Sequence, residues 1–94
     1  MPKGTVGGVP SPRRDAALAE EFGRRVRERR TAVGLSQEAL ADLAGVHRTF
    51  VGIIERGESG PTLATIVRLA AALDIDPGLL ISGMRLGASL HQPS

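Results

Sequence analysis

The segment His47–Gly57, HRTFVGIIERG, carries the side chains of this chain that are best suited to binding chemistry. It combines two arginines, Arg48 and Arg56, with the hydroxyl of Thr49 and with Gly52, in a pattern that otherwise predicts a short amphipathic helix. Guanidinium and hydroxyl groups donate hydrogen bonds to phosphates and to base edges. The question is why one helical face combines such donors with a glycine.

Other kinds of chemistry lack the residues that they need. The chain has no cysteine, and His47 and His91 are too far apart to suggest a ligand pair, so we expect no metal and no cofactor. The GTVGGVP segment lacks the preceding strand and the following lysine of a phosphate-binding loop. Without a nucleophile and base or a carboxylate pair, we do not expect an enzyme. At the start of a helix, His47 is expected to cap or to pack.

The length of 94 residues suffices for one small domain. No apolar run is long enough for a membrane span, and the N-terminal residues lack the apolar stretch of a secretory signal. With no cysteine to form disulfides, we expect a soluble protein in the reducing cytoplasm.

Charge is unevenly distributed along the chain. The formal net charge is +2, divided into +4 up to Gly34 and −2 beyond it. The basic part favours a polyanionic partner. The alternative is a solvated helix face with ion pairs such as Glu20 with Arg24 and Glu21 with Arg25.

The apolar periodicity predicts an all-α fold, since no segment shows the alternation of a strand. Helices are expected over residues 15–33, 37–44, 47–56, 63–73 and 77–81. N-caps are expected at Ser36, Thr62 and Asp76. The inward stripes are expected to hold Leu18, Phe22, Val26 and Val33, then Ala39, Leu40, Leu43 and Ala44, then Leu63, Ile66, Leu69, Ala70 and Leu73. Residues 1–14 are expected to form a flexible basic arm, residues 15–82 the domain, and residues 83–94 a tail.

The helices 37–44 and 47–56 are joined by a tight turn, an arrangement that can place the second helix in the major groove of DNA. From about Phe22 to Ile81, the chain resembles the Cro/C1-type helix-turn-helix domain of phage repressors and bacterial transcription regulators. The resemblance rests on LSQEALADLAGVHRTFVGIIERG, followed by the LATIVRLAAALDI and PGLLI helices. The HRTFVG segment is most similar to controller proteins of restriction-modification operons, with Phe50 where a tyrosine is expected.

This resemblance implies a five-helix, lambda-repressor-like domain that binds specific double-stranded DNA as a dimer and regulates transcription. It places Gln37 at a phosphate, Arg48 at the edge of a guanine and Thr49 at a base edge or a phosphate. It also places Ile53 at a thymine methyl and Arg56 at a phosphate. The candidate DNA-contact residues are Gln37, His47, Arg48, Thr49, Phe50, Gly52, Ile53 and Arg56.

The helical wheel agrees with these roles. Positions 48, 49, 52, 53 and 56 fall within an arc of about 140°, whereas Phe50, Val51 and Ile54 fall opposite and are expected to pack inward. On the outward face, Gly52 would let the helix backbone approach the groove, at a cost of about 1 kcal/mol relative to alanine. The alternative is that Gly52 is a tolerated surface glycine.

Arg30 is expected to serve the fold. It continues the stripe of Phe22 and Val26, so its head group needs a buried partner, and Glu55 borders the inward face of its own helix. The family resemblance implies the same ion pair between the first and third helices.

Two other kinds of partner, a protein and RNA, are alternatives for the same domain. An antitoxin or adaptor that binds another protein would use the apolar residues Ile81, Met84, Leu86 and Leu90. RNA binding is disfavoured, because the chain has no tryptophan or tyrosine and only two phenylalanines to stack on bases. Small helix-turn-helix domains usually bind DNA as dimers, so we expect the fifth helix and the tail to form a dimer surface.

Overall fold

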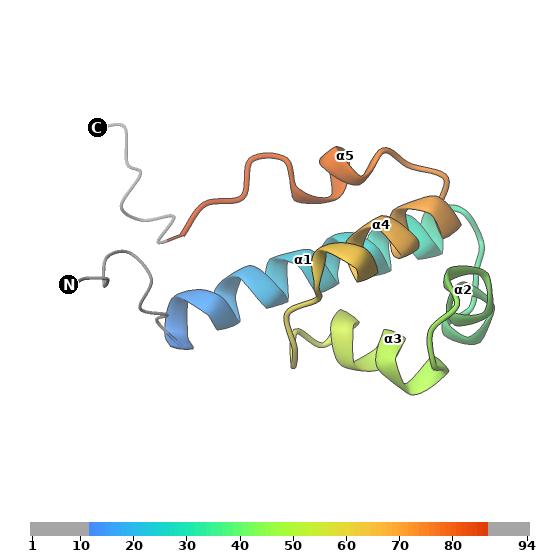
Figure 1. The fold of residues 1–94 in the computed structure, drawn as a ribbon, viewed down its shortest axis with the longest axis horizontal. Helices are drawn as coiled ribbons and strands as arrows, with labels where there is room; N and C mark the ends of the chain where they lie inside the picture. The colour runs from blue at the N-terminus through green and yellow to red at the C-terminus, as the bar shows by residue number, and fades with distance from the viewer. Residues whose placement is uncertain (1–11, 87–94) are drawn as a thin grey trace.

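The computed structural model describes residues 12–86, which form five α-helices and no strand. These are α1 (Pro12–Ala32), α2 (Gln37–Ala44), α3 (Arg48–Glu55), α4 (Leu63–Ala72) and α5 (Pro77–Ile81). Figure 1 shows α1 running the length of the molecule, with α3 along one side of it and α5 along the other. The all-α, five-helix prediction is confirmed. None of the helices within these residues combines the length and apolar composition that crossing a membrane requires.

The helices begin and end close to where local sequence signals place them. The side chains of Ser36, Thr62 and Asp76 accept hydrogen bonds from the backbone N–H groups two or three residues later, so each N-cap is confirmed. Gly45 closes α2 in the left-handed region, at φ 74°. Helix α1 begins at Pro12, three residues before its expected start, so the boundary expected between the arm and the domain lies inside a helix. The rest of the arm and residues 87–94 lie outside the described residues.

The core gathers one apolar face from each helix. Its buried members are Phe22, Val26, Leu40, Ala41, Ala44, Val51, Ile54, Leu69, Ala70, Leu73 and Leu80. Three stripe predictions were wrong, because Val33, Leu43 and Leu63 are exposed. Val33 follows the end of α1, and Leu43 and Leu63 lie at 63% and 75% exposure. A core this small covers only part of each apolar stripe.

Helices α1 and α3 approach closely because α1 has a glycine at their contact. Gly23 is buried, and a Cβ atom there would overlap the carbonyl oxygen of Ile54 and lie 2.8 Å from that of Glu55. At the end of α3, Gly57 adopts φ 73°, and a Cβ atom there would lie 2.7 Å from the Cα of Glu20. The two glycines thus set the position of α3 against α1.

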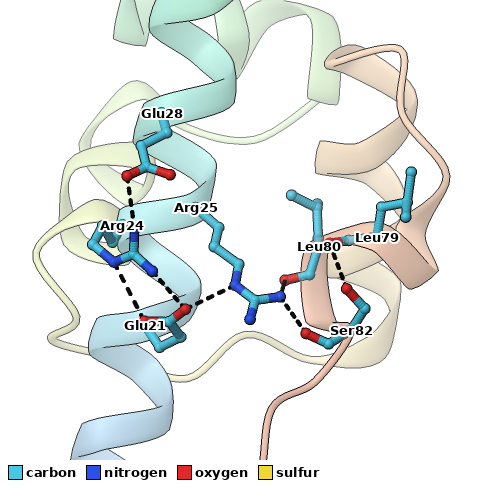
Figure 2. A network of polar contacts seen from close by, with 7 residues as sticks. All are labelled: Glu21, Arg24, Arg25, Glu28, Leu79, Leu80 and Ser82. Carbon is cyan, nitrogen blue, oxygen red and sulfur yellow. Dashed lines mark hydrogen bonds and ion pairs between the residues drawn. The ribbon is translucent and has the colours of Figure 1, made fainter.

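Two arginines of α1 bind the ends of the last two helices. Arg25 Nη1 donates to the carbonyl oxygens of Leu80, at 3.2 Å, and Ser82, at 2.7 Å (Figure 2). Arg29 makes the equivalent contact with α4, donating to the carbonyls of Leu73 and Asp74, each at 3.0 Å. Carbonyls at a helix C-terminus lack intrahelical partners and favour a nearby cation. Part of the basic charge of α1 therefore holds the fold together.

The exposed side of α1 carries a network of ion pairs around Glu21. Its carboxylate accepts from Arg24 at 2.6 Å and from Arg25 at 2.9 Å, while Arg24 also binds Glu28 at 2.7 Å (Figure 2). These hydrogen bonds, from Arg24 first and then Arg25, lower the pKa of Glu21. The predicted pair of Glu21 with Arg25 is confirmed. The predicted pair of Glu20 with Arg24 was wrong, since Arg24 binds Glu21 and Glu28 instead.

Candidate nucleic-acid interface

The entrance to α3 is fixed by a histidine cap. His47 has an extended backbone, and its Nδ1 accepts a hydrogen bond of 3.1 Å from the backbone N–H of Thr49. The left-handed turn at Gly45, just before it, sends the chain from α2 into α3. His47 is therefore a capping residue, as the sequence indicates, and its ring is exposed beside Arg48 and Thr49.

Helix α3 has one face against the core and one toward the outside. Val51 and Ile54 are buried, and Phe50 is half-buried against the core, as expected for the inward side. Arg48 and Thr49 are exposed at the N-terminal end of the helix, where side chains can reach into a groove. Of the candidate contact residues on α3, Phe50 thus serves packing, with only its exposed part left for a ligand.

Farther along α3, Ile53 is half-buried, and Gly52 is buried rather than open. The cause is Arg56, whose guanidinium folds back over the glycine: a Cβ atom at Gly52 would lie 3.0 Å from Arg56 Nη1. In this conformation the backbone at Gly52 is therefore covered by Arg56, and its close approach to a groove stays a prediction. Because the covering group is the end of a flexible exposed side chain, moving it would uncover the backbone.

Each charged candidate residue is paired with a carboxylate of the same chain. Arg48 Nη1 binds Glu38 Oε2 at 3.0 Å, across the turn from α3 to α2. Arg56 donates from Nε and Nη2 to the two carboxylate oxygens of Glu58, at 2.8 and 3.2 Å. This second pair raises the pKa of Arg56 and lowers that of Glu58 through their hydrogen bond.

Below this surface, the structure brings Arg30 and Glu55 together. Arg30 Nε and Nη2 donate to the two Glu55 oxygens at 2.6 and 3.0 Å, and Nη1 donates to the carbonyl of Leu35 at 2.9 Å. Their side chains are only 14% and 3% exposed. The hydrogen bond with Glu55 raises the pKa of Arg30.

Gln37 joins this pair from the first position of α2. Its Nε2 donates to Glu55 Oε1 at 3.0 Å, so one carboxylate links α1, the start of α2 and the end of α3. This link fixes α2 relative to α3. The N-termini of the two helices, which are the helix ends that can bind phosphate, therefore keep a constant relative position. The candidate surface is this pair of helix ends with the outward face of α3.

Sequence reasoning missed the residues that constrain this surface. Glu38 and Glu58 were not considered as partners of the arginines, although Glu58 lies only two residues from Arg56. Gly23 was also missed, because a glycine within a helical pattern shows no sign of what packs against it.

The apolar residues considered for a protein partner lie elsewhere. Ile81, Met84 and Leu86 line a groove together with Leu18 and Phe22 of α1, away from the outward face of α3. Leu90 lies outside the described residues, as does His91. Among residues 12–86, no group of histidine and carboxylate side chains could hold a metal ion.

Comparison with known proteins agrees with this geometry. A helix-turn-helix family model matches residues 26–80. The control protein C.SmaI of Serratia marcescens is 44% identical over 57 residues, which are 61% of this chain and 68% of the control protein. The crystal structure of the restriction-modification controller protein C.AhdI from Aeromonas hydrophila has a TM-score of 0.67 at 53% identity, over 68% of this chain and 97% of that one.

The P22 c2 repressor, solved in complex with a synthetic operator, has a TM-score of 0.62 at 32% identity, over 67% of this chain and 96% of the repressor. The family match spans α2 and α3, the helices whose exposed ends form the candidate surface. The region is a regulatory binding module and not an enzyme. The chain belongs to the Cro/C1-type helix-turn-helix family of DNA-binding transcription regulators.

Proposed function

We propose that this protein recognises a specific duplex DNA sequence as a homodimer, with the N-terminal end of α3 in the major groove. The observation that carries the proposal is the exposure of Arg48 and Thr49 at that end of α3, beside the N-terminus of α2. Arginine can bind guanine through two hydrogen bonds, and a helix N-terminus favours a phosphate. Since DNA is the ligand, we expect the protein in the cytoplasm.

Within this proposal the candidate residues take different roles. Arg48 and Thr49 read base edges, and Ile53 offers an apolar contact to a thymine methyl. Gln37 and Arg56 contact phosphates, which position the protein without reading sequence. His47 and Phe50 act mainly by holding α3, the first through its cap and the second through its packing.

The similarity to C.SmaI and C.AhdI suggests which genes are regulated. We infer that the protein controls a restriction-modification operon. Reporter transcription from the promoter next to its own gene, with and without the protein, would test this directly. A promoter whose transcription is the same with and without the protein would contradict it.

A dimer surface is available on α4 and α5. These helices pack against each other, and they leave Leu63, Val67, Leu79 and Ile81 exposed. Burying such residues in a twofold contact would remove apolar surface from water and place two α3 helices on successive major grooves. Two α3 helices, one from each protomer, contact more base pairs than one short helix can and therefore specify a longer sequence.

Sedimentation equilibrium tests the dimer. Leu79→Glu should weaken self-association at least tenfold, because the contact would bury the new charge. Leu43→Glu is the matched control, since Leu43 is equally exposed but lies on α2. A chain ending at Ser82 tests whether the tail contributes. An unchanged dimerisation constant for Leu79→Glu would exclude α5 from the interface.

The DNA proposal is tested with duplexes enriched from a randomised pool by the wild-type protein. Arg48→Ala should lose about 1–3 kcal/mol on the enriched duplex and relax its preference at one position per half-site. Arg56→Ala should weaken binding to the enriched and the shuffled duplex by the same factor. It should also lower the salt dependence of the binding constant by about one per protomer. Arg24→Ala controls for lost positive charge, because Arg24 binds Glu21 and Glu28 on α1. If Arg48→Ala and Arg56→Ala behave identically, the assignment of α3 is wrong.

A further inference from the structure

One arginine in the basic part of α1 has no partner in the fold. Between residues 24 and 30, four arginines bind carboxylates or helix-end carbonyls of the same chain: Arg24, Arg25, Arg29 and Arg30. The fifth, Arg27, is exposed, and its guanidinium forms no hydrogen bond or ion pair within the part of the chain that the structure describes. Packing and capping therefore do not account for Arg27.

Arg27 lies on the side of α1 that meets the end of α3. In an α-helix, the residues four before and three after a given position lie on its face. Four before is Gly23, where a Cβ atom would lie 2.8 Å from the carbonyl oxygen of Glu55. Three after is Arg30, which donates to the Glu55 carboxylate at 2.6 and 3.0 Å. Because both of these neighbours contact Glu55, Arg27 lies beside the last residue of α3.

The same glutamate relates Arg27 to the start of α2. Gln37, the first residue of α2 and a proposed phosphate contact, donates from Nε2 to Glu55 Oε1 at 3.0 Å. Arg27 on α1 and Gln37 on α2 thus both border Glu55. The long, exposed side chain of Arg27 can therefore reach a phosphate that lies against the start of α2.

The other arginines of this region are balanced by acids. Three of them, on or just below the candidate surface, are each paired with a carboxylate: Arg30 with Glu55, Arg48 with Glu38 and Arg56 with Glu58. These pairs add no net charge, whereas attraction to DNA depends on positive charge that neutralises phosphates. Arg27 can bind a phosphate without the loss of an ion pair within the described fold.

We propose that Arg27 binds the phosphate backbone of the duplex beside Gln37, so that α1 forms part of the DNA interface together with α2 and α3. The inference rests on the proposed function and adds to it a contact residue from a third helix. Every sequence carries the same phosphates, so Arg27 positions the protein on the duplex and reads no base.

The first experiment measures the affinity of the full-length protein for two duplexes of equal composition, one enriched from a randomised pool by the wild type and one shuffled. Arg27→Ala should weaken binding to both by the same factor and leave the ratio of the two affinities unchanged. Because one phosphate contact per protomer is lost, this deficit should be about threefold larger per protomer at about 50 mM than at 200 mM salt. Arg27→Lys should restore most of the affinity, since an ammonium group also binds phosphate.

Arg85→Ala is the control for the loss of one positive charge. Arg85 is also exposed, but it lines the groove that lies away from the outward face of α3. Thermal unfolding of Arg27→Ala should match that of the wild type, because Arg27 has no partner in the described part of the fold. An affinity loss in Arg27→Ala no larger than in Arg85→Ala would overturn the inference.

A second experiment identifies the phosphate that Arg27 contacts. Single phosphates of the enriched duplex are replaced in turn by uncharged methylphosphonates, which lack the negative charge that an arginine binds. At one phosphate per half-site, the replacement should weaken binding of the wild type but not of Arg27→Ala, because that variant has already lost the contact. Replacements elsewhere should weaken both proteins equally. If no phosphate distinguishes the two proteins, Arg27 makes no backbone contact and the inference is wrong.

Failure of this inference is distinguishable from failure of the proposed function. If Arg48→Ala loses specificity while Arg27→Ala binds like the wild type, only the inference fails. If the wild type enriches no sequence, the proposed function fails, and Arg27 is still tested by the affinity and salt dependence of binding to a random duplex. If the wild type binds no duplex at all, both are wrong.

Discussion

Gly23 of α1 lies directly against the backbone of Ile54 in α3, so closely that the two helices leave no room for a Cβ atom between them. The contact is backbone to backbone and lies at the C-terminal end of α3, whose last two residues are Ile54 and Glu55. The position of α3 therefore depends on a residue that has no side chain.

Replacing Gly23 by alanine should destabilise the protein, because the new methyl group must push α3 away from α1. We expect a loss of about 1–3 kcal/mol in the free energy of unfolding, as for other overpacked contacts. Urea denaturation measures it, with Gly60→Ala as the control, since a Cβ atom at Gly60 meets nothing within 4 Å. A Gly23→Ala protein as stable as Gly60→Ala would mean that the helices can separate at no cost.

Replacing both Arg30 and Glu55 should cost less stability than removing one of them alone. Glu55→Ala leaves the guanidinium of Arg30 without its partner in a mostly buried place, which should cost up to about 3 kcal/mol. Replacing both residues, Arg30→Met with Glu55→Leu, removes the two charges together and should leave stability nearer to the wild type. A double-mutant cycle by urea denaturation measures the coupling. Additive effects of the two single changes would show that the pair contributes no interaction energy.

Gly52 provides a steric test of how α3 meets DNA. Gly52→Leu should fold, since leucine favours helix, but its side chain would displace Arg56 and hold the helix away from the groove. We expect specific binding to fall to the level of shuffled DNA in duplex titrations. Gly52→Ala is the milder comparison, because its Cβ only requires the end of Arg56 to move. Wild-type affinity in Gly52→Leu would show that this part of α3 does not approach the duplex.

Acid should weaken the fold partly through Glu21. Its pKa is lowered in the folded protein by hydrogen bonds from Arg24 and Arg25, so it contributes stability above its ordinary value of 4.5 and loses that contribution as the pH falls below it. Urea midpoints at pH 7 and pH 3 should therefore differ less for Glu21→Gln than for the wild type. Glu20→Gln is the control from the preceding position on α1. A pH dependence equal in Glu21→Gln and wild type would remove Glu21 from the acid response.

Local features of the fold could be predicted from the sequence because their causes are local. Ser36, Thr62 and Asp76 each satisfy a backbone donor two or three residues away, so their types and positions alone indicate the caps. The inward and outward sides of α3 follow from its helical period in the same way, and Val51 and Ile54 are buried as that period requires.

Features that depend on distant segments were mostly not predicted; the ion pair of Arg30 with Glu55 was expected because the family resemblance implies it. Leu63 continues an apolar stripe, but whether a stripe residue is covered depends on what the rest of the chain can reach, and it is exposed. In the sequence, Arg29 is only one of the positive charges before Gly34, since its partners, the carbonyls of Leu73 and Asp74, lie 44 and 45 residues away. The covering of Gly52 by Arg56 is a side-chain conformation that no periodicity encodes.

The contacts of Arg25 with the end of α5 also bear on how the protein is made. Its acceptors, the carbonyls of Leu80 and Ser82, are synthesised 55 and 57 residues after Arg25 itself. While the chain is still emerging from the ribosome, α1 can form its own turns, but the polar groups that join it to α5 do not yet exist. The order of synthesis thus delays completion of the domain until residue 82 has left the exit tunnel.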